Sequence, residues 1–322
     1  MRKVFPDYFL ITLKGLTMGA ADVVPGVSGG TVAFIAGIYE ELIDTINNVD
    51  IKFFKNWKEQ GLLMAWNKMN GNFLVALLLG IGISILSFAK LITYLLKTHP
   101  IVIWSFFFGL IIASVVYMFK EITQWKWNSI LALMIGTAFA YFITILKPVE
   151  SPDGYLYLFI SGFIAIIAMI LPGISGSFIL LLMGSYEAVM ETINNARDGL
   201  FKGNFDMFKE AFFKIVVFAL GALLGIKLFS KVLKWLFEHY KNITLALLIG
   251  FMIGALNKIW PWKLVLQTRI NSKGEEVPFL EESVWPTAFD GEPKIFLAIL
   301  FSIIGFMLIF ILEFVANKFK KV

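Results

Sequence analysis

Apolar residues come in blocks long enough to cross a lipid bilayer, which takes about 20 helical residues. Six uninterrupted blocks are predicted to be spanning helices, at residues 73–96, 100–119, 126–146, 212–236, 242–260 and 295–316. Two further apolar stretches, one near the N-terminus and one after residue 154, are each interrupted by Pro-Gly-x-Ser-Gly. With 58% hydrophobic and 16% charged residues, and a mean hydropathy of +0.79, the chain is predicted to be an all-α polytopic membrane protein.

The two interruptions belong to a long internal repeat. Residues 21–48 and 168–195 align without a gap, with 12 of 28 positions identical. The next two spans of each half also align, at a slightly smaller offset, because one loop is shorter in the second half. Residues 1–322 are therefore predicted to form a single membrane domain, built from repeat one (8–146) and repeat two (155–316).

The length of the interrupted stretches predicts how they enter the membrane. Residues 8–24 precede the first break and 30–46 follow it, so each arm is about 25 Å long as a helix. Together the arms are too long for one crossing, and apolar flanks disfavour a turn outside the membrane. We expect a re-entrant hairpin plus three spans in each half, which inverts the halves and lets the hairpin tips approach. The alternative, a break within a single crossing, makes the repeats parallel.

The two hairpin tips, residues 25–31 and 172–178, have the chemistry of an anion site. Backbone that leaves a helix inside a membrane must line a cavity or be buried in protein. Ser28 and Ser175 are predicted to N-cap the outgoing arms, whose N–H groups attract phosphate. A close-packed kink without ligand is the alternative. The candidate phosphate-binding residues are Pro25, Gly26, Ser28, Gly29, Gly30, Thr31, Pro172, Gly173, Ser175, Gly176 and Ser177, together with Lys14 on the first incoming arm.

Several charged side chains fall within the apolar stretches and are candidates for coupling or gating. Asp22 precedes the first tip, where its counterpart is Met169, so it either carries a coupling proton or cation or caps a helix. The glutamates of the repeated Tyr-Glu pairs are expected about 18 Å along the outgoing arms, near the interface. The lysines near span ends either snorkel to the headgroups or contact lipid phosphate. The candidates are Asp22, Glu40, Glu187, Lys90 and Lys231.

Composition excludes several classes of chemistry. The chain has no Cys and only 2 His, which argues against thiolate or catalytic metal sites, and no cofactor is expected. A dispersed net charge of +5 suits anionic lipids better than nucleic acid. Lys and Arg number 15 on the N-terminal side of the predicted topology and 11 on the other, which favours a cytoplasmic N-terminus.

Three polar loops have patterns of their own. Residues 51–68 interleave Phe, Trp and Leu with Lys, which predicts an amphipathic helix in the membrane interface. Residues 201–212 look like its counterpart in the second half. The longest polar loop, 263–293, is predicted to contain a hairpin that turns at residues 271–274.

The doubled motif and the layout of the chain resemble a known family. The two PG(V/I)SG(G/S) motifs, the Tyr-Glu after each and the eight-element arrangement resemble the bacterial polyprenyl-phosphate transporter family. The resemblance covers essentially the full chain. It implies a multi-pass protein of the bacterial cytoplasmic membrane that returns undecaprenyl phosphate across the membrane during cell-envelope synthesis. Its motif positions correspond here to Asp22, Pro25, Gly26, Ser28, Gly29, Gly30, Pro172, Gly173, Ser175 and Gly176.

Two other functions remain open at the sequence level. Undecaprenyl-pyrophosphate phosphatases also have inverted halves, but their motif places an Arg where this chain has Gly29 and Gly176. Without that Arg a pyrophosphate-cleaving site lacks its bidentate clamp. An ion-coupled small-anion or solute carrier, or a channel, also fits paired broken helices, and a closed water-lined path distinguishes it from a lipid transporter. A proton- or ion-coupled lipid transporter is the favoured hypothesis, and the sequence gives no oligomeric state.

Overall fold

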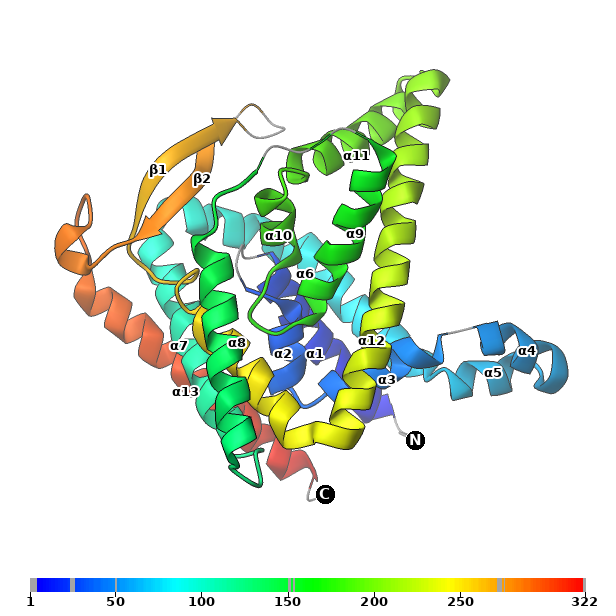
Figure 1. Ribbon diagram of the computed structural model, residues 1–322, viewed down its shortest axis with the longest axis horizontal. Helices are drawn as coiled ribbons and strands as arrows, with labels where there is room; N and C mark the ends of the chain where they lie inside the picture. The colour runs from blue at the N-terminus through cyan, green and yellow to red at the C-terminus, as the bar shows by residue number, and fades with distance from the viewer. Residues whose placement is uncertain are drawn as a thin grey trace.

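The first half of the chain folds as a broken hairpin followed by three long helices, as seen in a computed structural model (Figure 1). The structure describes residues 5–23, 27–49, 51–149, 152, 154–270, 274 and 276–320. The broken hairpin comprises α1 (Phe5–Asp22), α2 (Gly29–Ile35) and α3 (Tyr39–Asn48). After it come α4 (Ile51–Gln60), α5 (Leu62–Lys68), α6 (Gly71–Thr98), α7 (Pro100–Phe119) and α8 (Trp127–Ile145).

The second half repeats this order with fewer separate elements. Its hairpin comprises α9 (Tyr155–Ile170), α10 (Gly176–Leu182) and α11 (Tyr186–Phe201). The predicted spans at 212–236 and 242–260 are continuous in α12 (Phe205–Ala255), which is kinked where Tyr240 leaves helical geometry (φ −136°, ψ 43°). The last elements are β1 (Lys263–Ile270), β2 (Glu276–Ser283), the short 3-10 helix η1 (Pro286–Ala288) and α13 (Ile295–Lys320).

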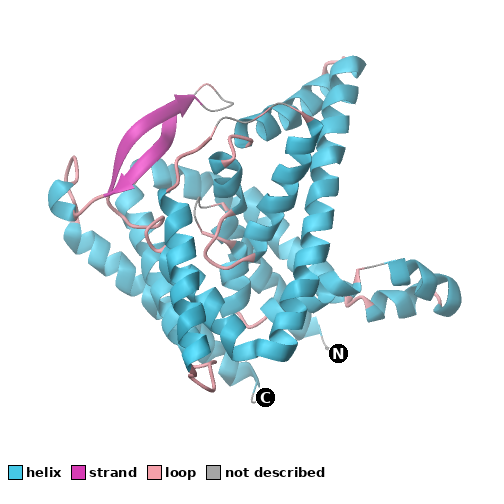
Figure 2. Cartoon of the chain, in the orientation of Figure 1, coloured by secondary structure: helices cyan, strands magenta, loops and turns pink. Residues whose placement is uncertain are grey.

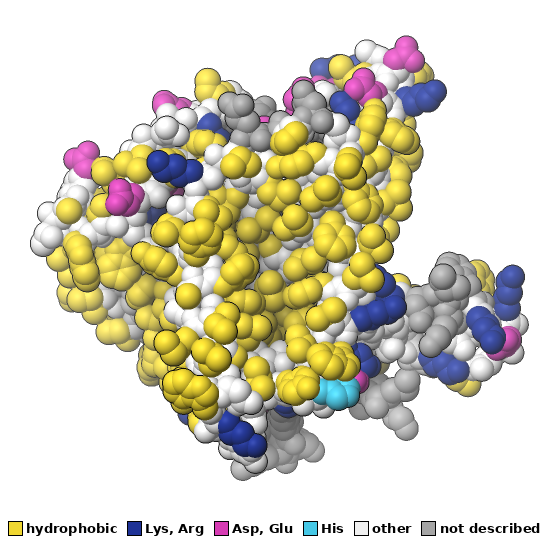
Figure 3. All heavy atoms as spheres, viewed as in Figure 1, with side chains coloured by type: hydrophobic (Ala, Val, Ile, Leu, Met, Phe, Trp, Pro, Cys, Tyr) yellow, Lys and Arg dark blue, Asp and Glu magenta, His cyan; other side chains and the backbone are white. Residues whose placement is uncertain are grey.

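The described helices identify a multi-pass membrane protein. Four of them, α6, α7, α8 and α12, are long and apolar enough to cross a bilayer. The bent pair α10–α11 also has the composition of a broken span or re-entrant segment. Figure 3 shows a broad apolar surface over the middle of the molecule, with charged side chains gathered toward its ends. This distribution matches a hydrocarbon-facing belt between two aqueous faces.

Close helix packing rests on glycines that admit a neighbouring backbone. A β-carbon at Gly80 of α6 would overlap the Thr12 carbonyl oxygen of α1, and one at Gly221 of α12 would overlap that of Phe159 of α9. Small residues let membrane helices approach in this way because lipid supplies no hydrophobic drive for association. The principal helix pairs are α1 with α6, α9 and α8 with the two parts of α12, and α7 with α13.

The all-α prediction is wrong for the longest polar loop, where β1 and β2 form an antiparallel two-stranded sheet (Figure 2). The separately predicted hairpin in this loop is confirmed, with Lys263 paired to Ser283 and Ile270 to Glu276. Its expected turn residues 271–273 lie outside the described residues. A sheet forms here because two strands outside the membrane can use water for their outer hydrogen-bonding groups, which lipid does not allow.

Both amphipathic loop predictions need correction. Residues 51–68 form two helices, α4 and α5, because Gly61 between them has φ +83°, a conformation that glycine adopts without penalty. The stretch 201–212 is not a separate helix: α11 ends at Phe201, Gly203 turns the chain with φ +73°, and α12 begins at Phe205. In Figure 1, α4 and α5 extend away from the helix bundle as an arm.

Candidate functional site

The first tip is held by its own polar side chains. α1 ends at Asp22, and the Gly29 N–H at the start of α2 donates to Asp22 Oδ1 (2.6 Å). Ser28 caps α2 as predicted, because its Oγ accepts from the Gly30 N–H (3.1 Å). Asp22 therefore acts as a cap in this structure, which leaves its coupling role a separate proposal. Pro25 and Gly26 lie outside the described residues.

The second tip has a different cap. α9 ends at Ile170, before Pro172, and Gly173 turns the chain with φ +89°. Ser175 occupies the N-cap position of α10, but its side chain makes no capping hydrogen bond, so that prediction is wrong. Its hydroxyl instead lies 2.9 Å from the Ser177 hydroxyl. The second tip thus keeps two adjacent hydroxyls that its helix does not use.

The two tips meet, although they lie in opposite halves of the chain. The Ser28 hydroxyl donates to the Met169 carbonyl oxygen (3.0 Å), and the Gly173 N–H donates to Thr31 Oγ1 (2.8 Å). Ser28 and Thr31 are 1% and 0% exposed. The first tip therefore supplies hydrogen-bonding partners to the backbone of the second, at a place where unpaired groups are costly.

Gly30 sets how closely the tips approach. A β-carbon at this position would lie 2.5 Å from the Ile170 carbonyl oxygen and 2.9 Å from that of Met169. At the second tip, a β-carbon at Gly176 would lie 2.7 Å from the Ala165 carbonyl oxygen of its own hairpin. The contact between halves thus depends on a hydrogen atom at residue 30, since any side chain meets backbone there.

The sequence predicted one continuous helix for each outgoing arm, and that prediction is wrong. Each is a seven-residue helix, α2 or α10, followed by a sharp bend; α10 and α11 meet at 109°. Gly37 and Gly184 make the bends with φ +66° and +68°. The residues after them, Ile38 and Ser185, donate their N–H groups to carbonyls five residues earlier (3.0 and 2.9 Å). This Schellman termination is the same in both halves, so both arms stop after two turns.

The bends change the setting of the repeated glutamates. Glu40 lies in the first turn of α3 and forms an ion pair with Lys241 of α12 (2.7 Å), with both side chains about half exposed. Glu187 lies in the first turn of α11 and forms an ion pair with Arg269 of β1, whose guanidinium also lies over the Tyr186 ring (5.1 Å). The expected position of the glutamates far along a straight arm is therefore wrong, because that arm ends before it reaches them.

The structure does not bring the candidate lysines to the tips. Lys14 donates to the Ala36 carbonyl (2.6 Å) at the C-terminal end of α2, about 10 Å from the first tip by helix length. Lys231 is exposed on α12. Lys90 lies within α6, but its side chain is outside the described part of the structure. Lys14 thus stabilises the end of a helix.

A family model described as VCA0040-like, undecaprenyl phosphate translocase-like, matches residues 18–277, which include both tips, both bends and β1. The chain belongs to this family. A protein of Vibrio cholerae serotype O1 named polyprenyl-phosphate transporter is 48% identical over 284 residues, 88% of each chain. A Staphylococcus aureus protein of the same name is 34% identical over 261 residues, 77% of this chain and 85% of the relative. No solved structure matches the chain.

The first tyrosine of the repeated Tyr-Glu pairs joins the two halves of this undecaprenyl phosphate translocase-like protein, a role that the sequence did not predict. Tyr39 is buried, and its hydroxyl donates to the Ile170 carbonyl oxygen (3.1 Å), so the first bend also contacts the second tip. Its ring packs edge-on against Phe34 and Phe237. The available signal was the identity of Tyr as well as Glu in both copies of the repeat.

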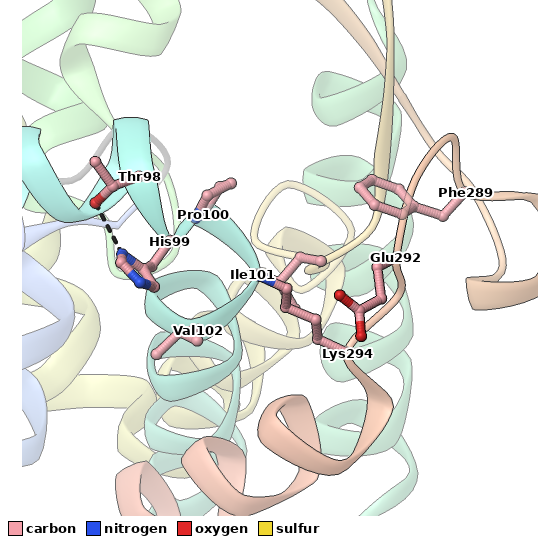
Figure 4. Close-up of a pocket in the computed structure, with 8 residues that line it drawn as sticks. All are labelled: Thr98, His99, Pro100, Ile101, Val102, Phe289, Glu292 and Lys294. Atoms are coloured by element: carbon pink, nitrogen blue, oxygen red, sulfur yellow. Dashed lines mark hydrogen bonds between the residues drawn. The ribbon is translucent and has the colours of Figure 1, made fainter.

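The family's tips are distinct from a peripheral pocket of about 300 Å³ at the junction of α6 and α7 (Figure 4). His99, Glu292 and Lys294 lie around it, and His99 Nδ1 is 2.8 Å from Thr98 Oγ1. His99 is exposed. None of the residues lining this pocket belongs to either tip.

Proposed function

We propose that this protein is a transporter of the bacterial cytoplasmic membrane that moves undecaprenyl phosphate or a related polyprenyl phosphate between leaflets, so that the carrier is reused in cell-envelope synthesis. The single observation that carries the mechanism is the meeting of the two tips through Ser28, Thr31 and the backbone of residues 169–173. The family assignment and the names of both relatives support the substrate. A polar midplane site lowers the cost of carrying a phosphate through hydrocarbon, while the prenyl chain stays in lipid.

Equivalent contacts support an inverted-repeat architecture. Gly109 of α7 packs against the Ser302 carbonyl of α13, while Gly250 of α12, its counterpart in the second repeat, packs against the Leu133 carbonyl of α8. Each contact joins a first-half helix to a second-half helix, and exchanging the halves converts one into the other. Figure 1 also places the start of α1 and the start of α9 toward opposite ends of the molecule. An approximate two-fold axis in the membrane plane accounts for both observations.

The proposed phosphate site lies where the tips meet. Its chemistry comes from the hydroxyls of Ser28, Thr31, Ser175 and Ser177. In the part of the chain that the structure describes, no acceptor pairs with the N–H of Gly176, whereas Asp22 occupies the equivalent N–H of Gly29. The two tips are therefore unequal, and an incoming anion is expected to prefer the second. Gly26 and Pro25 complete the proposed first tip.

Two interactions with the surroundings are part of the proposal. Asp22 carries the coupling proton or cation, since a carboxylate hydrogen-bonded at the tip responds to both the ion and the phosphate. The arm formed by α4 and α5 binds anionic lipids at the membrane surface, because exposed Trp57 and Leu63 accompany Lys55 and Lys58 on it.

The proposal is tested by reconstitution into liposomes with two assays. We expect leaflet exchange of polyprenyl monophosphate and no phosphate release from the pyrophosphoryl lipid, since Gly29 and Gly176 provide no guanidinium clamp. Phosphate release would indicate that the protein is a phosphatase and would contradict the proposal. Absence of both activities would favour an ion or small-solute carrier.

Removing one serine hydroxyl from each tip, as Ser28→Ala with Ser175→Ala, is expected to slow leaflet exchange about tenfold. Each lost hydrogen bond is worth about 0.5–1.5 kcal/mol, and 1.4 kcal/mol is a factor of ten. Thermal unfolding in detergent should show folded protein, because losing one N-cap costs only about 1 kcal/mol. The matched control is Ser87→Ala, whose hydroxyl bonds within α6 to Ile83. If the double variant exchanges lipid at the wild-type rate, the two hydroxyls have no part in transport and the motif serves helix packing alone.

A further inference from the structure

A cluster of charge lies between the end of α12 and the β-hairpin, outside the site described so far. The ammonium groups of Lys258 and Lys263 lie 3.5 and 3.7 Å from one carboxylate oxygen of Glu281. Their side chains are 18% and 7% exposed, and that of Glu281 is 21% exposed. Lys263 also donates to the Lys258 carbonyl. Three charges are thus largely removed from water at one place.

The cluster carries one positive charge too many. Within the described residues, no second carboxylate lies within ion-pair distance of either lysine. Burial lowers the pKa of Lys263 to about 8, because its ammonium has lost water and Lys258 repels it. Burial works to raise the pKa of Glu281, but attraction to Lys263 and Lys258 lowers it overall. A buried net charge of this kind is stabilised by a counter-ion, here an anion.

The cluster adjoins the second tip. Lys258 Nζ lies 4.5 Å from the centre of the Phe178 ring in α10, and Phe178 directly follows Ser177. The neighbouring backbone is close as well, since a β-carbon at Gly173 would lie 2.8 Å from the Phe251 carbonyl of α12. Lys258 therefore lies close to the residue that follows the Ser175 and Ser177 hydroxyls.

An apolar pocket of about 350 Å³ opens beside the cluster. Phe108, Trp260 and Trp285 supply aromatic lining, and Asn257 and Ser283 also line the pocket. Ser283 pairs with Lys263 across the sheet, and Asn257 directly precedes Lys258. Two lining residues are thus direct neighbours of the lysines of the cluster, and Trp285 is 73% exposed. Aromatic rings beside a cation match an isoprenoid chain that ends in a phosphate.

We propose that Lys258 and Lys263 bind the phosphate monoester of the polyprenyl phosphate on the face that carries the β-hairpin, with the first isoprene units against Phe108, Trp260 and Trp285. This proposal rests on the proposed function and adds to it a second binding site for the lipid phosphate, at one end of the transport path. Glu281 keeps the lysines together while the site holds no lipid. The ligand competes with Glu281 for the same two ammonium groups.

Competition between Glu281 and the ligand gives a test that distinguishes a binding site from a purely structural cluster. Removing the Glu281 charge should not weaken ligand binding at a binding site, whereas it should weaken binding if the carboxylate only holds the structure together. Binding of farnesyl phosphate to protein in nanodiscs is measured by titration calorimetry, with farnesol and inorganic phosphate as the two part-ligands. Lys258→Gln and Lys263→Gln should each weaken farnesyl phosphate binding about tenfold, the range of one charge-assisted contact. Glu281→Gln should bind as tightly as wild type or tighter, because it removes the competing carboxylate. Lys147→Gln, an exposed lysine in the α8–α9 loop, is the matched control and should bind as wild type.

Three results would overturn the proposal. The first is weaker binding in Glu281→Gln, which would mean that the ion pairs of the cluster only stabilise the fold. The second is unchanged binding in both lysine variants. The third is equal affinity for inorganic phosphate and farnesyl phosphate, which removes the role of the aromatic pocket.

A measurement on protein with both lysines intact guards against misfolded variants. Lys263 Nζ lies 4.1 Å from the centre of the Trp104 ring, so phosphate binding should change tryptophan fluorescence. Farnesyl phosphate should produce the change, and Trp104→Phe should lose part of it, because the remainder comes from Trp260 and Trp285 beside the isoprene units. A change of undiminished size in Trp104→Phe would contradict the proposal. Wild-type protein that binds farnesyl phosphate but fails to exchange polyprenyl phosphate would overturn the proposed function and leave this site standing.

Discussion

Replacing Gly30 with alanine is expected to cause a large loss of transport. The new β-carbon would meet the carbonyl oxygens of Ile170 and Met169, at 2.5 and 2.9 Å. These oxygens already accept hydrogen bonds from Tyr39 and Ser28, so neither can move without breaking a contact between the halves. Overpacking of this kind costs about 1–3 kcal/mol. Applied to the state in which the tips touch, it reduces leaflet exchange by roughly five- to a hundredfold.

The matched control is Gly82→Ala in α6. Nothing lies within 4 Å of a β-carbon at that position, so the substitution adds the same methyl group without a clash. It should leave leaflet exchange unchanged and raise the melting temperature slightly, because alanine is about 0.5–1 kcal/mol better than glycine inside a helix. If Gly30→Ala behaves like Gly82→Ala in the liposome assay, the contact between the tips has no part in transport.

The second large effect is expected from Asp22→Asn. The asparagine amide oxygen can still accept from the Gly29 N–H, so the cap remains while the charge is lost. We expect folded protein whose transport falls to the rate measured without an ion or pH gradient, since the group proposed to carry the coupling ion is gone. Leaflet exchange in liposomes with and without an imposed gradient measures this directly.

Asp22→Ala separates the cap from the coupling role. Alanine removes both the charge and the acceptor, so it should lower stability by about 1 kcal/mol more than asparagine does. Thermal unfolding of the two variants measures that difference. Gradient-driven transport at the wild-type level in Asp22→Asn would leave Asp22 as a helix cap alone, and the coupling ion would then act at another group.

The sequence was sufficient wherever a local pattern decides the structure. Residues 100–119 were predicted as a span and form α7 with the same limits. The internal repeat located both broken helices, and Ser28 caps α2 as its place after Pro-Gly predicts. The glycines at 37 and 184 were visible as identities, but their effect, a helix end with positive φ, was not recognised.

Contacts between distant residues needed the tertiary structure. The polar partners of Tyr39 and Thr31 lie in the other half of the chain, and no spacing pattern relates a hydroxyl to a backbone group 131 or 142 residues away. The same holds for Lys258, which meets Phe178 only because the segment after α12 passes beside α10.

By itself, the sequence determined a duplicated, multi-pass membrane protein with a broken helix in each half, because hydrophobic length and helix-breaking residues act locally. Only the tertiary structure decided that Asp22 caps one tip while Ser175 and Ser177 at the other pair with each other, and that Lys14 points to the far end of α2. The physical reason is that each donor has several possible acceptors and bonds to one that lies within reach. Which acceptor lies within reach depends on how the helices pack.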